Sequence, residues 1–173
     1  MVNSKQSKKR GSKISKRALE LRAQLWPDLD EALLWKRTIA KGFTTIPRTF
    51  PHMLDIMDDL AGKGTPVSKV YLSLWCRVFD EGMLELKSYD EMAYEAGFSG
   101  QRAVTTWKQR MSLLVKLGFI FVENGIRGEY DYVLILNPYP VIKRLYEKKA
   151  FQKQKYIALF ARAQEIGATD LQD

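Results

Sequence analysis

The chain has 173 residues, 46% of them hydrophobic and 12% aromatic, which fits one ordinary globular domain that buries a core. No run of eighteen apolar residues occurs, and the basic N-terminus lacks an apolar region, so we expect neither a membrane span nor a secretory signal. The single cysteine, Cys76, excludes an intrachain disulfide and predicts a cytoplasmic protein. The single histidine, His52, leaves little from which to build a zinc site or a catalytic triad.

The net charge of +8 is concentrated at one end of the chain. Residues 1–17 carry seven basic side chains and no acid, whereas the following 156 residues carry 21 basic and 20 acidic side chains. The first 17 residues are also polar and rich in serine and lysine, so we expect a disordered tail. Two interpretations of this tail remain open. It is either an arm that contacts DNA phosphates through residues such as Lys8, Lys9 and Arg10, or a solubilising terminus.

Residues 18–64 predict an N-terminal helical extension. A first helix covers 18–25 and stops where a proline follows, because the residue before a proline resists the helical conformation. Asp28 suits the N-cap of a second helix over 29–39, and a third over 52–60 carries apolar residues at helical spacing. The tryptophans are all predicted core residues: Trp26, Trp35, Trp75 and Trp107.

Residues 65–137 predict a separate, compact set of elements. Thr65 and Pro66 suit the N-cap and the first position of a helix that continues to Asp80. This helix has the widest apolar stripe in the chain, so we expect it to lie in the core. The alternating residues 83–87 then predict a short strand.

The centre of the chain is the stretch GFSGQRAVTTWKQRMSLLVKLGFIFVENG. Before it, Ser88 is followed three residues later by a glutamate, which predicts a capped short helix over 89–95. A tight glycine turn leads into a longer helix over 100–117, which a glycine ends. Two apolar runs, 119–122 and 130–136, predict a β-hairpin with a flexible, glycine-containing tip.

This order of helix, strand, helix, turn, helix, strand and strand resembles the winged helix-turn-helix family over roughly seventy residues. The phrase GFSGQRAVTTW, followed by LVKLGFI, is similar to regulators and replication-associated proteins of plasmids and phages. The resemblance implies a mainly α-helical, winged-helix fold that binds double-stranded DNA and needs no cofactor, metal ion or catalytic residue. The chain departs from a minimal winged helix in the residues before Pro66, because that family does not require them.

Residues 138–173 predict one long C-terminal helix that runs to about Ile166, with prolines only in its first turn. Apolar residues recur at heptad positions, but Lys149 and Gln152 interrupt that register. We therefore expect either a short homodimer contact or packing of this helix back onto its own domain.

The helix over 100–117 has one apolar and one polar face. Apolar residues three or four positions apart predict the buried face: Val104, Trp107, Met111 and Leu114. The opposite face has no acid and offers arginine and glutamine to base edges, and threonine, serine and lysine to phosphates. The predicted DNA-binding residues are Ser99, Gln101, Arg102, Thr105, Thr106, Lys108, Gln109, Ser112 and Lys116, together with Arg127 at the hairpin tip.

These features predict a sequence-specific double-stranded DNA-binding protein: a transcriptional regulator, or a replication or maintenance factor of a mobile element. The alternative is an interaction module within a larger nucleic-acid-associated complex, because winged helices also use the same helix to grip another protein. No enzyme signature is present in the sequence. Three aspartates on one helix are expected to form a solvated acidic face rather than a metal site: Asp55, Asp58 and Asp59.

Overall fold

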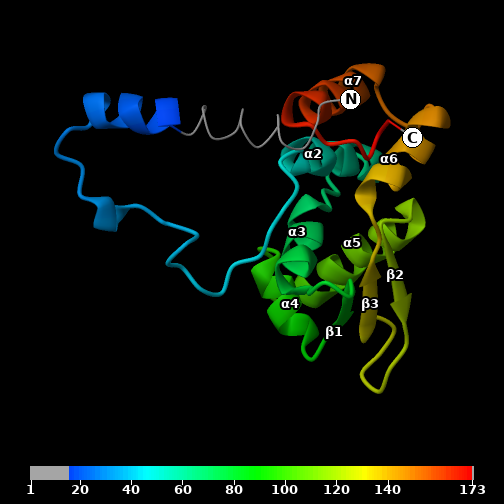
Figure 1. Cartoon of the computed structure of the whole chain (residues 1–173). Helices are drawn as coiled ribbons and strands as arrows, with labels where there is room; N and C mark the ends of the chain where they lie inside the picture. The colour runs from blue at the N-terminus through cyan, green and yellow to red at the C-terminus, as the bar shows by residue number, and fades with distance from the viewer. Residues whose placement is uncertain (1–15, 173) are drawn as a thin grey trace. The chain divides into compact units, whose positions relative to one another are not determined.

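The computed structural model describes residues 16–172, which are drawn in colour in Figure 1. The chain forms two compact units, one ending at Thr45 and the other beginning at Ile46. The predicted phosphate-binding residues of the tail lie outside the described part of the chain: Lys8, Lys9 and Arg10. Their role therefore stays a prediction.

The first unit contains a helix over residues 16–25 and one short 3₁₀ helix, η1, Glu31–Leu33. The latter begins at Asp30, whose carboxylate accepts a hydrogen bond from a backbone amide at 2.9 Å, and it ends within one turn. The prediction of a helix over 29–39 is therefore wrong. An isolated helix of about ten residues is only marginally stable in water, and the described residues of this unit include none that is buried against it.

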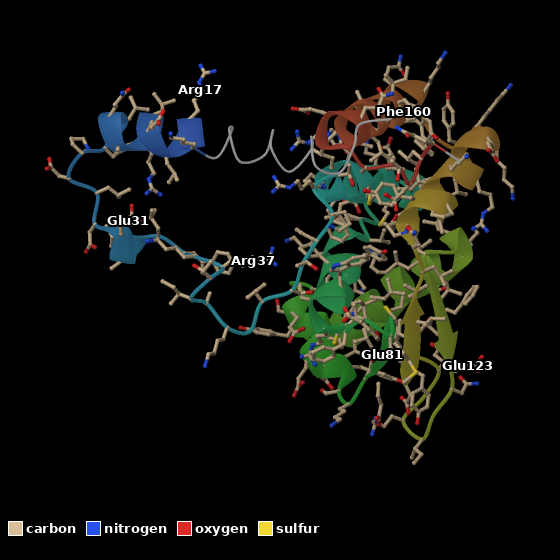
Figure 2. All side chains as sticks on the ribbon, in the orientation of Figure 1. Arg17, Glu31, Arg37, Glu81, Glu123 and Phe160 are labelled. Atoms are coloured by element: carbon tan, nitrogen blue, oxygen red, sulfur yellow. The ribbon has the colours of Figure 1, made fainter. Side chains whose placement is uncertain are left out.

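Aromatic side chains of the first unit are exposed. Trp26 and Trp35 are 59% and 68% exposed, so the prediction that both are core residues is wrong. The ring of Trp35 packs edge-on against that of Phe43, with 5.8 Å between centroids, and the Glu31 carboxylate (labelled in Figure 2) pairs with the Lys36 amine at 2.5 Å. These contacts join neighbouring turns, but single turns provide no second layer to bury an indole.

The second unit is mainly helical, as predicted. Its helices are α2 Phe50–Ala61, α3 Ser68–Arg77, α4 Tyr89–Glu95, α5 Ala103–Leu117, α6 Pro138–Glu147 and α7 Lys153–Ile166. Helix α2 packs against α3, α5, α6 and α7 and so contributes to most of the core. The buried side chains of Thr49 and Tyr139 are hydrogen-bonded at 2.6 Å between their oxygens, which ties the start of α2 to α6. Among the described helices, none combines the length and apolar content that crossing a bilayer requires.

A small antiparallel sheet completes this unit. Its strands are β1 Met83–Glu85, β2 Ile120–Glu123 and β3 Tyr132–Ile135, in the order β1-β3-β2 (Figure 1). Leu84 of β1 pairs with Val133 of β3, and both are buried. This inner face closes the core over the helices.

The outer face of the sheet carries an apolar row. Leu134 of β3 pairs with Met83 of β1 on one side and with Phe121 of β2 on the other. These three side chains are 38%, 57% and 57% exposed, respectively. The next row places Tyr132 between two glutamates. The sheet therefore has a buried face and an apolar face that meets solvent.

The first backbone amides of α3 are capped by a side chain of α2 and not by the residue before α3. The Asp58 carboxylate accepts hydrogen bonds from the amides of Val67 and Ser68, at 2.7 and 2.8 Å. The Thr65 hydroxyl instead donates to the carbonyl oxygen of Ala61 at 2.6 Å. The predicted N-cap at Thr65 is therefore wrong, because a carboxylate from the preceding helix satisfies the amides at this helix start.

Helices α4, α5, α6 and α7 end in the same way. A residue of positive φ follows the last turn, and the next amide bonds to the carbonyl oxygen five residues before it, at 2.9–3.0 Å. That residue is a glycine in three cases, Gly97, Gly118 and Gly167, but in α6 it is Lys149, with φ 54°. Lysine is not a usual residue for this ending. The prediction of one long C-terminal helix is therefore wrong, since α6 and α7 are separate.

Helix α7 packs back onto α2. Leu159 and Ala163 are 0% and 2% exposed, so they belong to the core of their own chain. The Lys155 amine pairs with the carboxylates of Asp55 and Asp59 at 2.9 and 2.8 Å. The sequence predicted either a short homodimer contact or packing of this segment onto its own domain, and the structure shows the packing onto its own domain. Asp55 and Asp59 are on the solvent-exposed side of α2, as predicted, with side chains 61% and 38% exposed, and they also pair with α7.

Candidate nucleic-acid interface on helix α5

Helices α4 and α5 are joined by a tight turn. The Ser88 hydroxyl accepts a hydrogen bond from a backbone amide at 3.2 Å, so α4 begins where the capping pattern predicts. Helix α5 begins at Ala103, slightly later than predicted. Gln101 and Arg102 therefore lie in the turn, directly before the first residues of α5.

One face of α5 is anchored in the core. Trp107, Met111 and Leu114 are each 0% exposed, as predicted for this face. The ring of Trp107 lies 5.5 Å from that of Tyr89 and 5.7 Å from that of Tyr130, measured between centroids. These contacts fix α5 against α4 and against the residues that precede β3, so its outward face has a defined orientation.

The predicted DNA-binding residues are mostly brought together on the opposite side. The exposed members are Ser99, Gln101, Arg102, Thr105, Gln109, Ser112 and Lys116. Thr106 and Lys108 are half-buried, and the Lys108 amine lies over the Tyr89 ring, 5.0 Å from its centroid. This cation–π contact holds Lys108 at the edge of the face.

The stretch 99–117 has four basic side chains, but one of them is structural. Arg110 is 8% exposed, and its Nη2 donates a hydrogen bond to the carbonyl oxygen of Gly64 at 3.2 Å. This hydrogen bond therefore joins α5 to the loop between α2 and α3. Arg102, Lys108 and Lys116 remain as the basic groups on the outward side.

The outward face of α5 is free of carboxylates, because no acid occurs between Glu95 and Glu123. Arg77 of α3 pairs with two glutamates of α4: its Nε donates to Glu95 at 2.8 Å, and its Nη2 lies 3.6 Å from Glu91. The hydrogen bond from Arg77 lowers the pKa of the Glu95 carboxyl. The N-terminus of α5 adds partial positive charge, since no side chain caps it. The charged side chains on this face are therefore all basic.

The β2–β3 hairpin is held at its base by Asp131, which is 2% exposed. Its carboxylate accepts hydrogen bonds from the Tyr89 hydroxyl at 2.6 Å and from the Arg127 amide at 2.8 Å. Both hydrogen bonds lower the pKa of the Asp131 carboxyl, and the bond from Tyr89 has the larger effect. Burial raises the pKa of the Tyr89 hydroxyl. A side chain at Gly125 would overlap the Asp131 carboxylate. The hairpin loop is thus tied to α4.

The guanidinium of Arg127 is engaged within the protein. Its Nε donates to the Leu86 carbonyl oxygen at 3.3 Å, and its Nη2 lies 3.2 Å from a Glu85 carboxylate oxygen. The side chain that projects from the loop is Ile126, which is fully exposed. The charge pattern of the tip does not point to Ile126. Its signal in the sequence is an isoleucine in an otherwise polar turn, which is the type of apolar side chain that DNA-binding proteins can insert into a minor groove.

The arrangement offers exposed hydrogen-bond donors and acceptors on a face whose charged groups are all basic, which is the chemistry that binds a polyanion. Within residues 16–172, no group of three or more histidine, cysteine, aspartate or glutamate side chains is placed to hold a metal ion. Comparison with protein-family models, curated proteins and solved structures finds no match to this chain.

Proposed function

We propose that the chain is a winged helix-turn-helix protein that binds double-stranded DNA sequence-specifically, as a transcriptional regulator or a replication or maintenance factor of a mobile element. The succession α3, β1, α4, α5, β2, β3 and the sheet order β1-β3-β2 are compatible with that family. The observation that carries the proposal is the outward face of α5, which is polar, mostly exposed and free of carboxylates, opposite the buried Trp107, Met111 and Leu114.

In the proposed complex the N-terminal part of α5 enters the major groove. Arg102 donates two hydrogen bonds to a guanine edge, and Gln109 or Gln101 exchanges two with an adenine edge. Thr105 and Lys116 bind phosphates, which positions the helix without reading sequence. Ile126 at the hairpin tip lies against the minor groove. All the side chains assigned to these contacts are exposed, so a duplex can reach them.

The test is the replacement of Arg102 by alanine. Because this variant cannot make the bidentate arginine–guanine contact, we expect a cost of ~1–3 kcal/mol on the preferred site and relaxed choice at one base pair. A preferred site is first selected from a random duplex library. Binding of both proteins to that site and to its single-base variants is then measured at one fixed salt concentration.

Two variants serve as controls for the Arg102→Ala result. Lys116→Ala removes a phosphate contact, so it is expected to weaken all duplexes by the same modest factor. Trp107→Ala removes a fully buried ring and is expected to destabilise the fold by ~3–5 kcal/mol, whereas the other two variants keep wild-type stability. Equal binding of all duplexes by wild type and Arg102→Ala would contradict the assignment of Arg102 as a base reader.

A second candidate function is an interaction module within a larger nucleic-acid-associated complex. The outer row of the sheet favours it, because Met83, Leu134 and Phe121 form a contiguous exposed apolar surface. On this alternative, Phe121→Ser abolishes binding of a protein partner and leaves duplex binding unchanged. If Arg102→Ala also leaves duplex binding unchanged and abolishes a protein contact, α5 is an interaction surface.

A further inference from the structure

Charge in the second unit is segregated into two positive stretches. Residues 46–173 carry 17 basic and 16 acidic side chains, which is a net charge of +1. Residues 96–122, which include α5, hold four basic groups and no acid, and residues 143–153 hold five basic groups and one acid. The remainder of the unit therefore has eight basic and fifteen acidic groups, a net charge of −7. Such separation creates a directed field rather than a neutral surface.

The second positive stretch, residues 143–153, forms the corner between α6 and α7, and we call it the α6–α7 corner. Lys148, Lys149 and Lys153 are exposed there, and none of them forms an ion pair with another described residue. Glu147 is the single acid of the corner. Figure 1 shows α6 and α7 at the end of the unit away from the hairpin loop. The charge of the corner is thus open to a ligand.

Local helix stability does not favour all three of these lysines. Lys148 lies at the C-terminus of α6, where a cation is favourable by about 0.3–1 kcal/mol. Lys153, however, is the first residue of α7, where a cation opposes the helix dipole, and no acid occupies that first turn. Lys149 adopts the left-handed conformation that disfavours a side chain. Lys153 therefore carries its charge, and Lys149 its side chain, against local preference.

The corner is packed through a stacked pair of rings and begins beside the end of α5. The rings of Tyr146 and Tyr156 stack with 3.9 Å between centroids and an interplanar angle of 2°, which ties the end of α6 to α7. Arg144 of α6 lies against Gly118, so closely that a Cβ at that glycine would clash with the guanidinium. The two positive stretches therefore meet at the C-terminus of α5.

We propose that the α6–α7 corner is a second contact surface for the phosphate backbone of duplex DNA. The inference rests on the proposed DNA-binding function and adds a surface to it. Helix α5 is about 22 Å long at 1.5 Å per residue, which is shorter than one turn of duplex at about 34 Å. A duplex read by the start of α5 therefore extends far enough to meet the corner next to its end. The lysines bind phosphates as point charges and add affinity for every sequence equally.

The experiment compares two double variants of the full chain with equal loss of charge. Lys148→Gln with Lys153→Gln changes the corner, and Lys63→Gln with Lys87→Gln changes two exposed lysines outside both positive stretches. Binding to a random-sequence duplex of about three helical turns is measured over a range of salt concentrations. Removal of two phosphate contacts is expected to reduce the slope of log K against log salt by about 1.8. The control pair is expected to keep the wild-type slope, and thermal unfolding confirms that each variant folds.

The possible outcomes separate this inference from the proposed function. If the wild-type protein binds duplex and both double variants keep its slope, the corner is not a DNA contact, while the proposed function stands. If the wild-type protein does not bind duplex, both proposals are wrong. Vesicles containing phosphatidylserine provide the last comparison. Binding to these vesicles that requires Lys148 and Lys153, without duplex binding, would assign the corner to an anionic membrane surface instead.

Discussion

At the scale of single residues, Asp131 has the most consequential environment in the candidate interface. Its buried carboxylate accepts hydrogen bonds from the Tyr89 hydroxyl and the Arg127 amide, and so connects the hairpin loop to α4. The amide of Tyr130 donates to the same Tyr89 hydroxyl at 3.2 Å. One ionised group thereby orders the loop that presents Ile126.

The lowered pKa of Asp131 predicts a dependence of stability on pH. Because the pKa of the folded state lies below that of the unfolded state, the stabilisation is complete above the ordinary aspartate pKa of about 4. It is lost as the pH falls through the lower, folded-state pKa. Asp131→Asn keeps the shape but has no charge and only one acceptor oxygen, whereas the wild-type carboxylate accepts through both oxygens. The variant is therefore expected to be less stable than wild type at pH 7.

The measurement is chemical unfolding of wild type and Asp131→Asn at about pH 7 and at acid pH values below about 4. The difference in unfolding free energy between the two proteins is expected to shrink as the pH falls, because protonation removes the charge that the variant already lacks. Tyr89→Phe removes the main hydrogen bond and is expected to reduce the same pH dependence. A difference that stays constant across this pH range would contradict the account.

At the scale of elements, helix ends decide the topology of the second unit. Gly97, Gly118 and Gly167 end their helices in the left-handed conformation, and Lys149 does so without the freedom of a glycine. The backbone hydrogen bonds are the same at all four ends. The break between α6 and α7 therefore depends on tertiary contacts, among them the Tyr146–Tyr156 stack.

Lys149→Gly is expected to stabilise the protein by about 1 kcal/mol, because glycine adopts the left-handed conformation without the steric cost that lysine bears. The matched control is Lys148→Gly, which removes the same charge one position earlier, where φ is −78°. At this φ glycine relieves no steric strain, and it lowers the free energy of unfolding by a few tenths of a kcal/mol through backbone entropy. Urea unfolding midpoints of both variants measure the contrast. Equal midpoints would show that the strain at Lys149 is negligible.

At the scale of the whole molecule, the distribution of charge determines how a polyanion is expected to approach. Residues 1–17 hold seven basic side chains and no acid, so they are a further candidate for contact with phosphates. Their deletion is expected to weaken binding to all duplexes alike and to reduce the salt slope by about 0.9 for each phosphate that the tail neutralises. An unchanged slope and affinity after deletion would leave this tail as a solubilising segment.

A substitution variant keeps the length of the tail and provides the control for its deletion. Replacing Lys8, Lys9 and Arg10 by glutamine in the full chain removes charge without shortening it. If the tail acts through phosphates, this variant is expected to lower the salt slope in proportion to the number of charges removed, on preferred and random duplex equally. A weakening that appears only after deletion, and not after this substitution, would exclude phosphate contacts by these three residues.

Much of the secondary structure follows from signals between near neighbours in the sequence. The Ser88 cap, the glycines that end α4 and α5, and the apolar stripe through Trp107 are local patterns, and the structure has each of them. The outward face of α5 was predictable for the same reason. Once one face of a helix is buried, its periodicity determines which residues remain exposed.

Tertiary structure decided what depends on partners distant in sequence. Arg110 and Arg127 look like free cations in the sequence, but Gly64 and Leu86 accept their hydrogen bonds within the protein. Asp58 begins α3 in place of the predicted cap, and the break at Lys149 divides one expected helix into two. Trp26 is exposed while Trp107 is fully buried, although the sequence predicts both as core residues. Local periodicity states which side chains share a face, whereas burial requires a second layer that only the folded chain provides.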